Sequence, residues 1–210
     1  MGNRALAVAA SLHAEASDLL YKHGLHDALS SCGEVYYTGS YALDLMVWPD
    51  LDISLRLNPS FHSIDRFFEV GRRIAECDNV VSMKFHNFHQ FPVPELPPGL
   101  YWNAKINRLH SDAVSSGLPW KIDIWSMDEE AVDENRRDME RIKKSLTQET
   151  RTLILDVKYS LITEEGRTPV LSGYHIYQAV LVEGIKDREE IMKYLRDHGI
   201  DLKDGRTERS

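Results

Sequence analysis

Two aspartates in an alternating stretch constrain this chain more than any other feature of its sequence. Residues 50–57 (DLDISLRL) alternate polar with apolar side chains, which is the pattern of a half-buried β-strand. Successive side chains of a strand point to opposite faces, so Asp50 and Asp52 project from one face while Leu51 and Ile53 enter the core. The chain is therefore expected to hold two carboxylates side by side on a sheet.

A third acid, Asp123, has the same setting in residues 120–125 (WKIDIW). If the two strands are neighbours, three carboxylates converge. Each pair about 5 Å apart repels by roughly 3 kcal/mol at an effective dielectric near 20, and three pairs approach about 10 kcal/mol. A domain with about 5 to 15 kcal/mol of net stability needs compensation for such a cluster. Divalent cations supply it, and oxygen ligands without His or Cys favour Mg²⁺ or Mn²⁺ over zinc.

Gly39 and Ser40 stand at a predicted strand-to-helix turn before the first pair of acids. The β-rich run 34–38 precedes them, and nine residues separate Ser40 from Asp50. Glycine lets the backbone approach a ligand closely, serine adds a hydroxyl, and a helix start exposes N–H groups that bind phosphate. Metal-binding acids beside a phosphate-binding turn are typical of a site for a metal-bound nucleoside triphosphate.

These residues together resemble the nucleotidyltransferase superfamily related to DNA polymerase β. Its members carry Gly-Gly or Gly-Ser on a strand-helix turn, then Asp-x-Asp or Asp-x-Glu about ten residues later, and a third acid on a later strand. Gly39, Ser40, Asp50, Asp52 and Asp123 stand at those positions, and the resemblance covers roughly residues 30–128.

The resemblance implies transfer of a nucleoside monophosphate (NMP) from a nucleoside triphosphate (NTP) to an acceptor, with release of pyrophosphate. Asp50 and Asp52 would bind two Mg²⁺ ions. Asp123 would complete one metal site and assist deprotonation of the acceptor hydroxyl. Gly39 and Ser40 would hold the β and γ phosphates. The structural alternatives are an exposed strand face for the first pair and, for Asp123, a core carboxylate paired with Lys121 or Lys105.

Two further residues are candidate nucleotide-binding groups. Lys158 lies on a predicted helix with apolar neighbours, and superfamily members often place a helical lysine against the triphosphate. Tyr177, like Tyr174, could stack on the base. A solvated lysine and core packing of the tyrosines are the structural alternatives. Small-molecule members of the superfamily often carry an acid just after the Gly-Ser turn, where Asp44 stands, but a surface or capping role is favoured for this residue.

The order of predicted elements indicates a mixed α/β (α+β) fold, in which a mixed sheet is flanked by helices. The predicted strands are 34–38, 50–57, 79–88, 100–109 and 118–126. Helices are expected at 3–23, 41–47 and 63–77, with Ser63 as an N-cap, and then near 131–163, 172–184 and 187–198. The proline-rich connector 91–99 is expected as an extended loop.

Strand signals end at about residue 128. We therefore expect a catalytic domain over 1–128, a helical C-terminal subdomain over 129–203 and a frayed tail over 204–210.

Net charge and composition limit the classes of partner that this chain is expected to bind. The 210 residues carry a net charge of −8, so the chain lacks the broad basic face that binds long nucleic acid, and a polynucleotide would need a local basic patch. No apolar run approaches the roughly 20 residues that span a bilayer. Cys32 and Cys77 have no metal spacing and indicate free thiols in a reducing, cytoplasmic setting. We expect an NTP substrate, a small-molecule or protein acceptor, and neither a membrane nor a nucleic-acid partner.

Two other functions stay open. A nucleotide-binding or antitoxin-like partner protein would keep the fold with little catalysis, and loss of a triad acid would favour it. No triad acid is lost. An RNA-modifying nucleotidyltransferase is disfavoured by the net charge and because the sequence shows no added basic RNA-binding domain.

Overall fold

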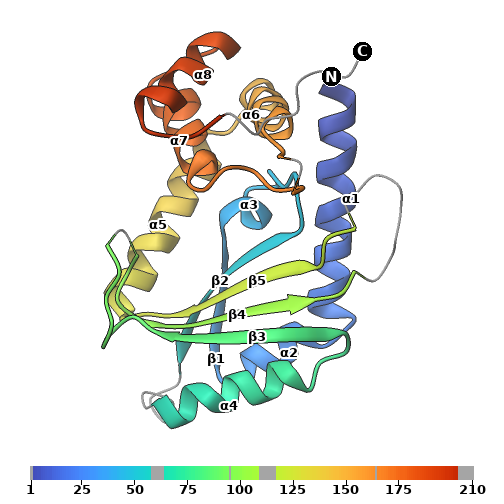
Figure 1. The fold of residues 1–210 in the computed structure, drawn as a ribbon, viewed down its shortest axis with the longest axis vertical. Coiled ribbons are helices and arrows are strands. Elements are labelled where there is room, and N and C mark those ends of the chain that lie inside the picture. The colour runs from blue at the N-terminus through green and yellow to red at the C-terminus, as the bar shows by residue number, and fades with distance from the viewer. Residues whose placement is uncertain (1, 58–63, 95, 109–116, 164, 203–210) are drawn as a thin grey trace.

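A five-stranded mixed sheet forms the centre of the fold (Figure 1). The computed structural model describes residues 2–57, 64–94, 96–108, 117–163 and 165–202. The strands, in spatial order, are β1 (Gly33–Thr38), β2 (Asp50–Leu57), β5 (Trp120–Ser126), β4 (Leu100–Ile106) and β3 (Val80–Asn87). β2 and β5 are parallel, and the other neighbours are antiparallel. The predicted fold class is confirmed.

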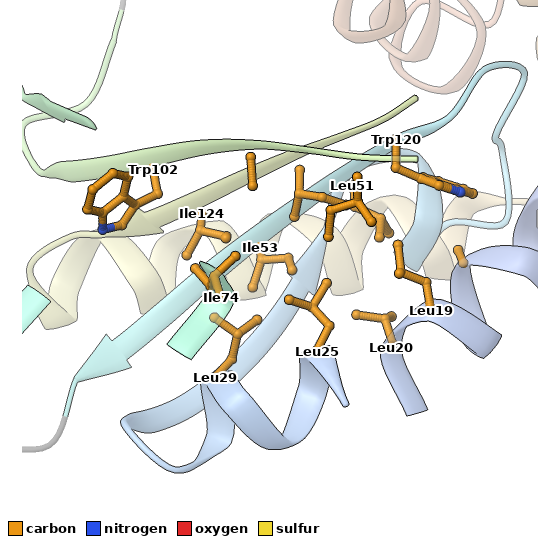
Figure 2. Close-up of a cluster of buried hydrophobic side chains, with 14 of the residues drawn as sticks. Leu19, Leu20, Leu25, Leu29, Leu51, Ile53, Ile74, Trp102, Trp120 and Ile124 are labelled. Atoms are coloured by element: carbon orange, nitrogen blue, oxygen red, sulfur yellow. The ribbon is translucent and has the colours of Figure 1, made fainter. Parts of the chain in front are cut away.

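Three helices cover one face of the sheet: α1 (Gly2–Tyr21), α2 (Leu25–Ser30) and α4 (Ile64–Ala75). Their buried side chains meet the apolar positions of the strands (Figure 2). This core includes Leu19, Leu20, Leu25, Leu29 and Ile74 of the helices, and Leu51, Ile53, Trp102, Trp120 and Ile124 of the sheet. The alternation of residues 50–57 thus predicted the inward face correctly, and the acids lie on the opposite face.

The chain after β5 is helical, with α5 (Glu129–Ser145), α6 (Gln148–Ser160), α7 (Ser172–Tyr177), a π-helical turn (Gln178–Val182) and α8 (Arg188–Asp197). A second apolar cluster joins these helices to Ala5 and Ala9 of α1 and to Leu43, Leu45 and Val47. Strands do give way to helices at about residue 128. The division into two domains there stays a prediction, because the helical part shares its core with α1.

Two predicted helices differ from the structure. The helix expected over 41–47 is the four-residue α3 (Gly39–Ala42). Asp44 takes a φ of 55°, and a right-handed helix cannot continue through a positive φ. The helical stretch 131–163 is divided at Thr147, whose hydroxyl accepts from the Thr150 N–H while the Thr150 hydroxyl accepts from the Thr147 N–H. This capping box begins α6.

Strand and loop predictions hold to within a few residues. The strand predicted over 79–88 spans 80–87. The strand predicted over 100–109 ends at Ile106, and the strand predicted over 118–126 begins at Trp120. No strand forms in the described part of connector 91–99. Ser63 and the tail 204–210 lie outside the described residues. Among the described helices, none is long and apolar enough to cross a membrane.

Gly71 lets α4 pack closely on the sheet. A Cβ at this position would lie 2.5 Å from Cζ2 of Trp102, whose indole N–H donates to the Phe67 carbonyl at 3.1 Å. We expect Gly71→Ala to lower the free energy of unfolding by about 1 to 3 kcal/mol, the usual range for overpacking, as measured by urea denaturation. In the control Gly173→Ala, the new Cβ meets only the Tyr177 hydroxyl, at 3.9 Å. That variant should be neutral or slightly stabilised, so equal losses in both would contradict the packing argument.

Candidate active site

Asp50, Asp52 and Asp123 come together on the face of the sheet opposite α1, α2 and α4. The parallel pairing of β2 with β5 sets Asp52 opposite Asp123 and Asp50 opposite Lys121. One oxygen of each of the three carboxylates lies within 4.8 Å of the other two. The convergence predicted from the two strands is therefore present.

The triad carries more negative charge than its protein surroundings neutralise. Burial raises the pKa of Asp50 to about 7, with the Asp52 charge adding to the effect. Burial and then the Asp123 charge raise the pKa of Asp52 as well. Three oxygen ligands held together against their own repulsion fit a divalent cation, which favours their ionised forms.

Lys121 is the counter-ion of the triad. Its ammonium lies 3.1 Å from Oδ1 of Asp50 and 2.5 Å from Oδ2 of Asp123. Burial opposes the lysine charge, but the two aspartates together raise its pKa. The pairing of Asp123 with Lys121, expected as a structural alternative, is thus present, and it coexists with the carboxylate cluster.

Tyr101 and Asn103 hold the other oxygen of Asp123. The tyrosine hydroxyl donates to Oδ1 at 2.7 Å and the asparagine amide donates to it at 2.8 Å. Burial raises the pKa of Tyr101, and the negative charge of Asp123 adds to this. Sequence reasoning missed Tyr101, because its contact depends on the register of β4 against β5, which pairs Asn103 with Asp123. The only sequence signal is that alternation puts residues 101 and 103 on one strand face.

The Gly39–Ser40 turn packs directly on the triad. Gly39 has a φ of 59°, and a Cβ at that position would overlap Oδ2 of Asp52. The positive φ and the close approach of Asp52 each require a glycine at this position. Thr38, the residue before the turn, is opposite Asp52 in the β1–β2 register, and Ser40 is half-buried at the start of α3. The turn is therefore adjacent to the acids, as its spacing predicted.

Lys158 and Tyr177 contact each other. The lysine is only 4% exposed, and its ammonium donates to the Leu45 carbonyl at 2.7 Å and to the Tyr177 hydroxyl at 3.0 Å. The positive charge of Lys158 lowers the pKa of Asp52, but burial of Asp52 raises this pKa by more, so the net change is upward. Burial excludes the solvated lysine considered above. The Tyr177 ring is 8% exposed, whereas Tyr174 is 57% exposed.

Asp44 lies in an ion pair with Arg151 of α6, at 2.5 Å. The pair joins the end of the α3 segment to the helical part of the chain. The contact agrees with the structural role expected for this residue.

The comparisons with solved structures show which fold this is. A mutant of the Cid1 poly(U) polymerase bound to MgATP aligns with a TM-score of 0.55 and 17% identity, over 83% of this chain and 51% of that one. A second structure of Cid1, an enzyme with RNA terminal uridylyl transferase activity, aligns with a TM-score of 0.55 and 16% identity, over 82% of this chain and 47% of that one. A cytoplasmic RNA terminal U-transferase aligns at 0.51 and 15% identity, over 83% and 49%.

The chain therefore has the fold of the DNA polymerase β-like nucleotidyltransferases to which these structures belong. It spans about half the length of the solved structures it matches. No protein-family model matches the sequence, and no curated protein does.

The raised pKa of Asp50 predicts a pH dependence of stability when divalent cations are removed. The folded value of about 7 exceeds the ordinary 3.8, so the folded state binds the proton more tightly than the unfolded chain. The stability from this proton is fully present below about pH 4 and is lost as pH rises through about 7. At about 1.4 kcal/mol per unit, the free energy of unfolding in EDTA should fall by about 2 to 3 kcal/mol between about pH 5 and pH 8.

Urea denaturation at the two pH values measures this change. Asp50→Asn should flatten the pH dependence, while Asp138→Asn on the exposed surface of α5 should keep it. An equal slope in wild type and Asp50→Asn would contradict the assignment to Asp50.

Proposed function

We propose that this protein is a metal-dependent nucleotidyltransferase, which moves an NMP from an NTP to an acceptor hydroxyl and releases pyrophosphate. The observation that carries the proposal is the cluster of three carboxylates, all within 4.8 Å, packed against the Gly39–Ser40 turn. The cluster supplies hard ligands for Mg²⁺ or Mn²⁺, and the turn supplies a phosphate site beside them. The nucleotidyltransferase fold supports the same function.

The first two acids and the third have different roles in the proposal. Asp50 and Asp52 hold two cations, whose chemistry is to neutralise charge on the phosphates and on the attacking and leaving oxygens. Asp123 completes one metal site and assists removal of the acceptor proton. Tyr101 and Asn103 fix Asp123 through its Oδ1, while Lys121 contacts its Oδ2, so a cation bound at Asp123 would share that oxygen with the lysine or replace it. Gly39 and Ser40 bind the β and γ phosphates.

Lys158 and Tyr177 form one unit of the proposed nucleotide site. The lysine charge lies near Asp52, in a position to balance a triphosphate, and Tyr177 fixes the ammonium through its hydroxyl. Because the Tyr177 ring is buried, we assign base stacking to the exposed Tyr174, one turn earlier on α7. Tyr177 then contributes to nucleotide binding through Lys158.

Nucleotide binding should require both the metal and the first two acids. We expect calorimetry to detect binding of ATP or GTP with Mg²⁺, and to detect little with EDTA or with Asp50→Asn/Asp52→Asn. The surface pair Asp138→Asn/Asp197→Asn is the control for charge and should bind as wild type does. Unchanged metal-dependent affinity in the triad variant would overturn the proposed site.

Asp123→Asn should separate binding from transfer. The third acid acts mainly on the second metal and the attacking oxygen, so nucleotide affinity should change little. Transfer of label from an α-labelled NTP should drop by at least about 10²-fold, the lower range for positioned acid-base assistance. Nearly normal turnover would show that Asp123 is a structural partner of Lys121. Wild type that binds nucleotide but transfers no label to any acceptor would favour the nucleotide-binding or antitoxin-like alternative.

The acceptor has two candidate classes. The net charge of −8 favours a small molecule or a protein over a polyanion. Two lysines favour single-stranded RNA: Lys84 on β3 is opposite Asn103, and Lys105 on β4 is opposite Lys121, the counter-ion of the triad. These lysines are far apart in sequence, and only the sheet register brings them together. They form no basic run that composition could reveal.

A row of aromatic rings adjoins the lysines. Trp125, Tyr101 and His86 are opposite one another on β5, β4 and β3, with ring centroids 4.6 and 5.7 Å apart. Phe88 stacks on His86 and Trp125 at 5.3 Å from each. Lysines beside aromatic rings are how proteins hold single strands. The names of the similar structures, a poly(U) polymerase and an RNA terminal U-transferase, support this second candidate.

Salt-dependent binding distinguishes the two classes. If Lys84 and Lys105 contact RNA phosphates, filter binding of single-stranded RNA should show a log-log salt slope of about −1.4. Lys84→Glu/Lys105→Glu should flatten this slope and weaken binding, and the control Lys144→Glu/Lys193→Glu should not. A flat slope in wild type, with label transfer to small molecules or protein, would instead support the compact acceptor.

The free thiols Cys32 and Cys77 support a reducing, cytoplasmic setting for this chemistry.

A further inference from the structure

A cavity of about 410 Å³ lies along the free edge of β1, on the opposite side of this strand from β2. Four consecutive strand residues, 35–38, line it. Because side chains alternate between the two faces of a strand, four residues in a row can line one cavity only along the backbone edge. Among the described residues, the recorded backbone partners of this stretch all lie in β2. Within the part of the chain that the structure describes, the cavity therefore presents a strand edge without a pairing strand.

Helices stand on both sides of this edge. On one side, His13 of α1 stacks on Tyr41 with centroids 4.7 Å apart, and Tyr37 meets Tyr41 edge-on at 5.3 Å. The Tyr41 hydroxyl bonds with Ser17 at 3.1 Å and the Tyr37 hydroxyl with His26 at 2.6 Å. These bonds fix the rings, so the α1 side of the cavity is a rigid aromatic wall.

The other wall is one stripe of α5, formed by Val132, Arg136, Met139, Glu140 and Lys143. Its two cations are exposed. Arg136 lies over the Tyr36 ring at 5.9 Å and has a weak ion pair with Asp133 at 3.8 Å, while Lys143 has no recorded ion pair with another described residue. In a chain of net charge −8, this wall carries two cations and one anion, Glu140, which lies between them along the helix.

We propose that this slot binds an extended acidic peptide of another protein, which adds as a sixth strand to β1. A strand edge supplies main-chain hydrogen bonds to such a peptide, and alternating side chains supply specificity. A lone strand needs only the roughly 4.8 Å spacing of a sheet, whereas a second copy of this chain would bring a whole sheet against α1 and α5. The inference does not depend on the proposed transferase activity.

The side chains on the two walls of the cavity determine which peptide sequences should bind there. Alternate residues face the rings of His13, Tyr37 and Tyr41, and should be apolar or aromatic. The others face α5, where Arg136 and Lys143 are about 10 Å apart along the helix axis. Same-side residues of a strand are about 6.7 Å apart, so acids two to four positions apart reach both cations and avoid Glu140.

The test uses a fluorescein-labelled hexapeptide, matching the six residues of β1, in which Glu alternates with Tyr or Val. Fluorescence anisotropy with the full chain should detect saturable binding. The same peptide with Lys for Glu should bind at least about tenfold more weakly, and so should one whose strand-pairing amides are N-methylated. Amide hydrogen exchange should slow at residues 35–38 when the peptide binds.

The chain offers a matched control on α5. Arg136→Glu/Lys143→Glu should abolish binding of the Glu peptide and favour the Lys peptide. Arg137→Glu/Lys144→Glu makes the same changes one position along, outside the cavity, and should bind as wild type does. Failure of every peptide to bind, or equal losses in the two variants, would overturn the proposal. A concentration-dependent dimer lost only in Arg136→Glu/Lys143→Glu would overturn it in favour of a second copy.

Discussion

The parallel pairing of β2 with β5 is the contact on which the rest of the site depends. It sets Asp52 directly opposite Asp123, so two like charges sit on adjacent strands of one sheet. The apolar residues that alternate with these acids along the two strands, among them Leu51, Ile53 and Ile124, are fully buried on the other face of the sheet. Packing of the core therefore stabilises the β2–β5 register, which repulsion between the carboxylates destabilises. Lys121, Tyr101 and Asn103 offset part of the repulsion, and a bound cation would offset more.

Period-two alternation explains why so much of the site was readable from the sequence. Each strand that carries an acid alternates cleanly, so the residue types of 50–57 and 120–126 show which strand face carries the acids and which enters the core. The sequence also predicted a functional role for Gly39, because a phosphate-binding turn favours glycine. It did not predict the close contact of Gly39 with Asp52. Helix boundaries near Asp44 and Thr147 depend on a positive φ and on a hydroxyl-to-backbone exchange, and neither leaves a periodic signal.

Properties that depend on which strands are neighbours were not readable. Lys84 and Lys105 lie twenty-one positions apart in the sequence, and only the pairing of β3 with β4 brings them together on one face of the sheet. Net charge averages over the whole surface, so it conceals such a patch. The same holds for the slot at β1, which needs α1 and α5, far apart in the chain, to stand on either side of one edge.

Helix α1 belongs to both apolar clusters, and this has a consequence for folding cooperativity. Val8 and Leu12 lie in the core beneath the sheet, while Ala5 and Ala9 lie in the core of the helical part. One rigid helix thus couples the two, so neither core can open without freeing a face of α1. The change from strands to helices at about residue 128 marks a difference in architecture, and α1 contributes to the cores on both sides of it. The chain should melt in one transition, and cutting it there would leave two fragments with exposed apolar surface.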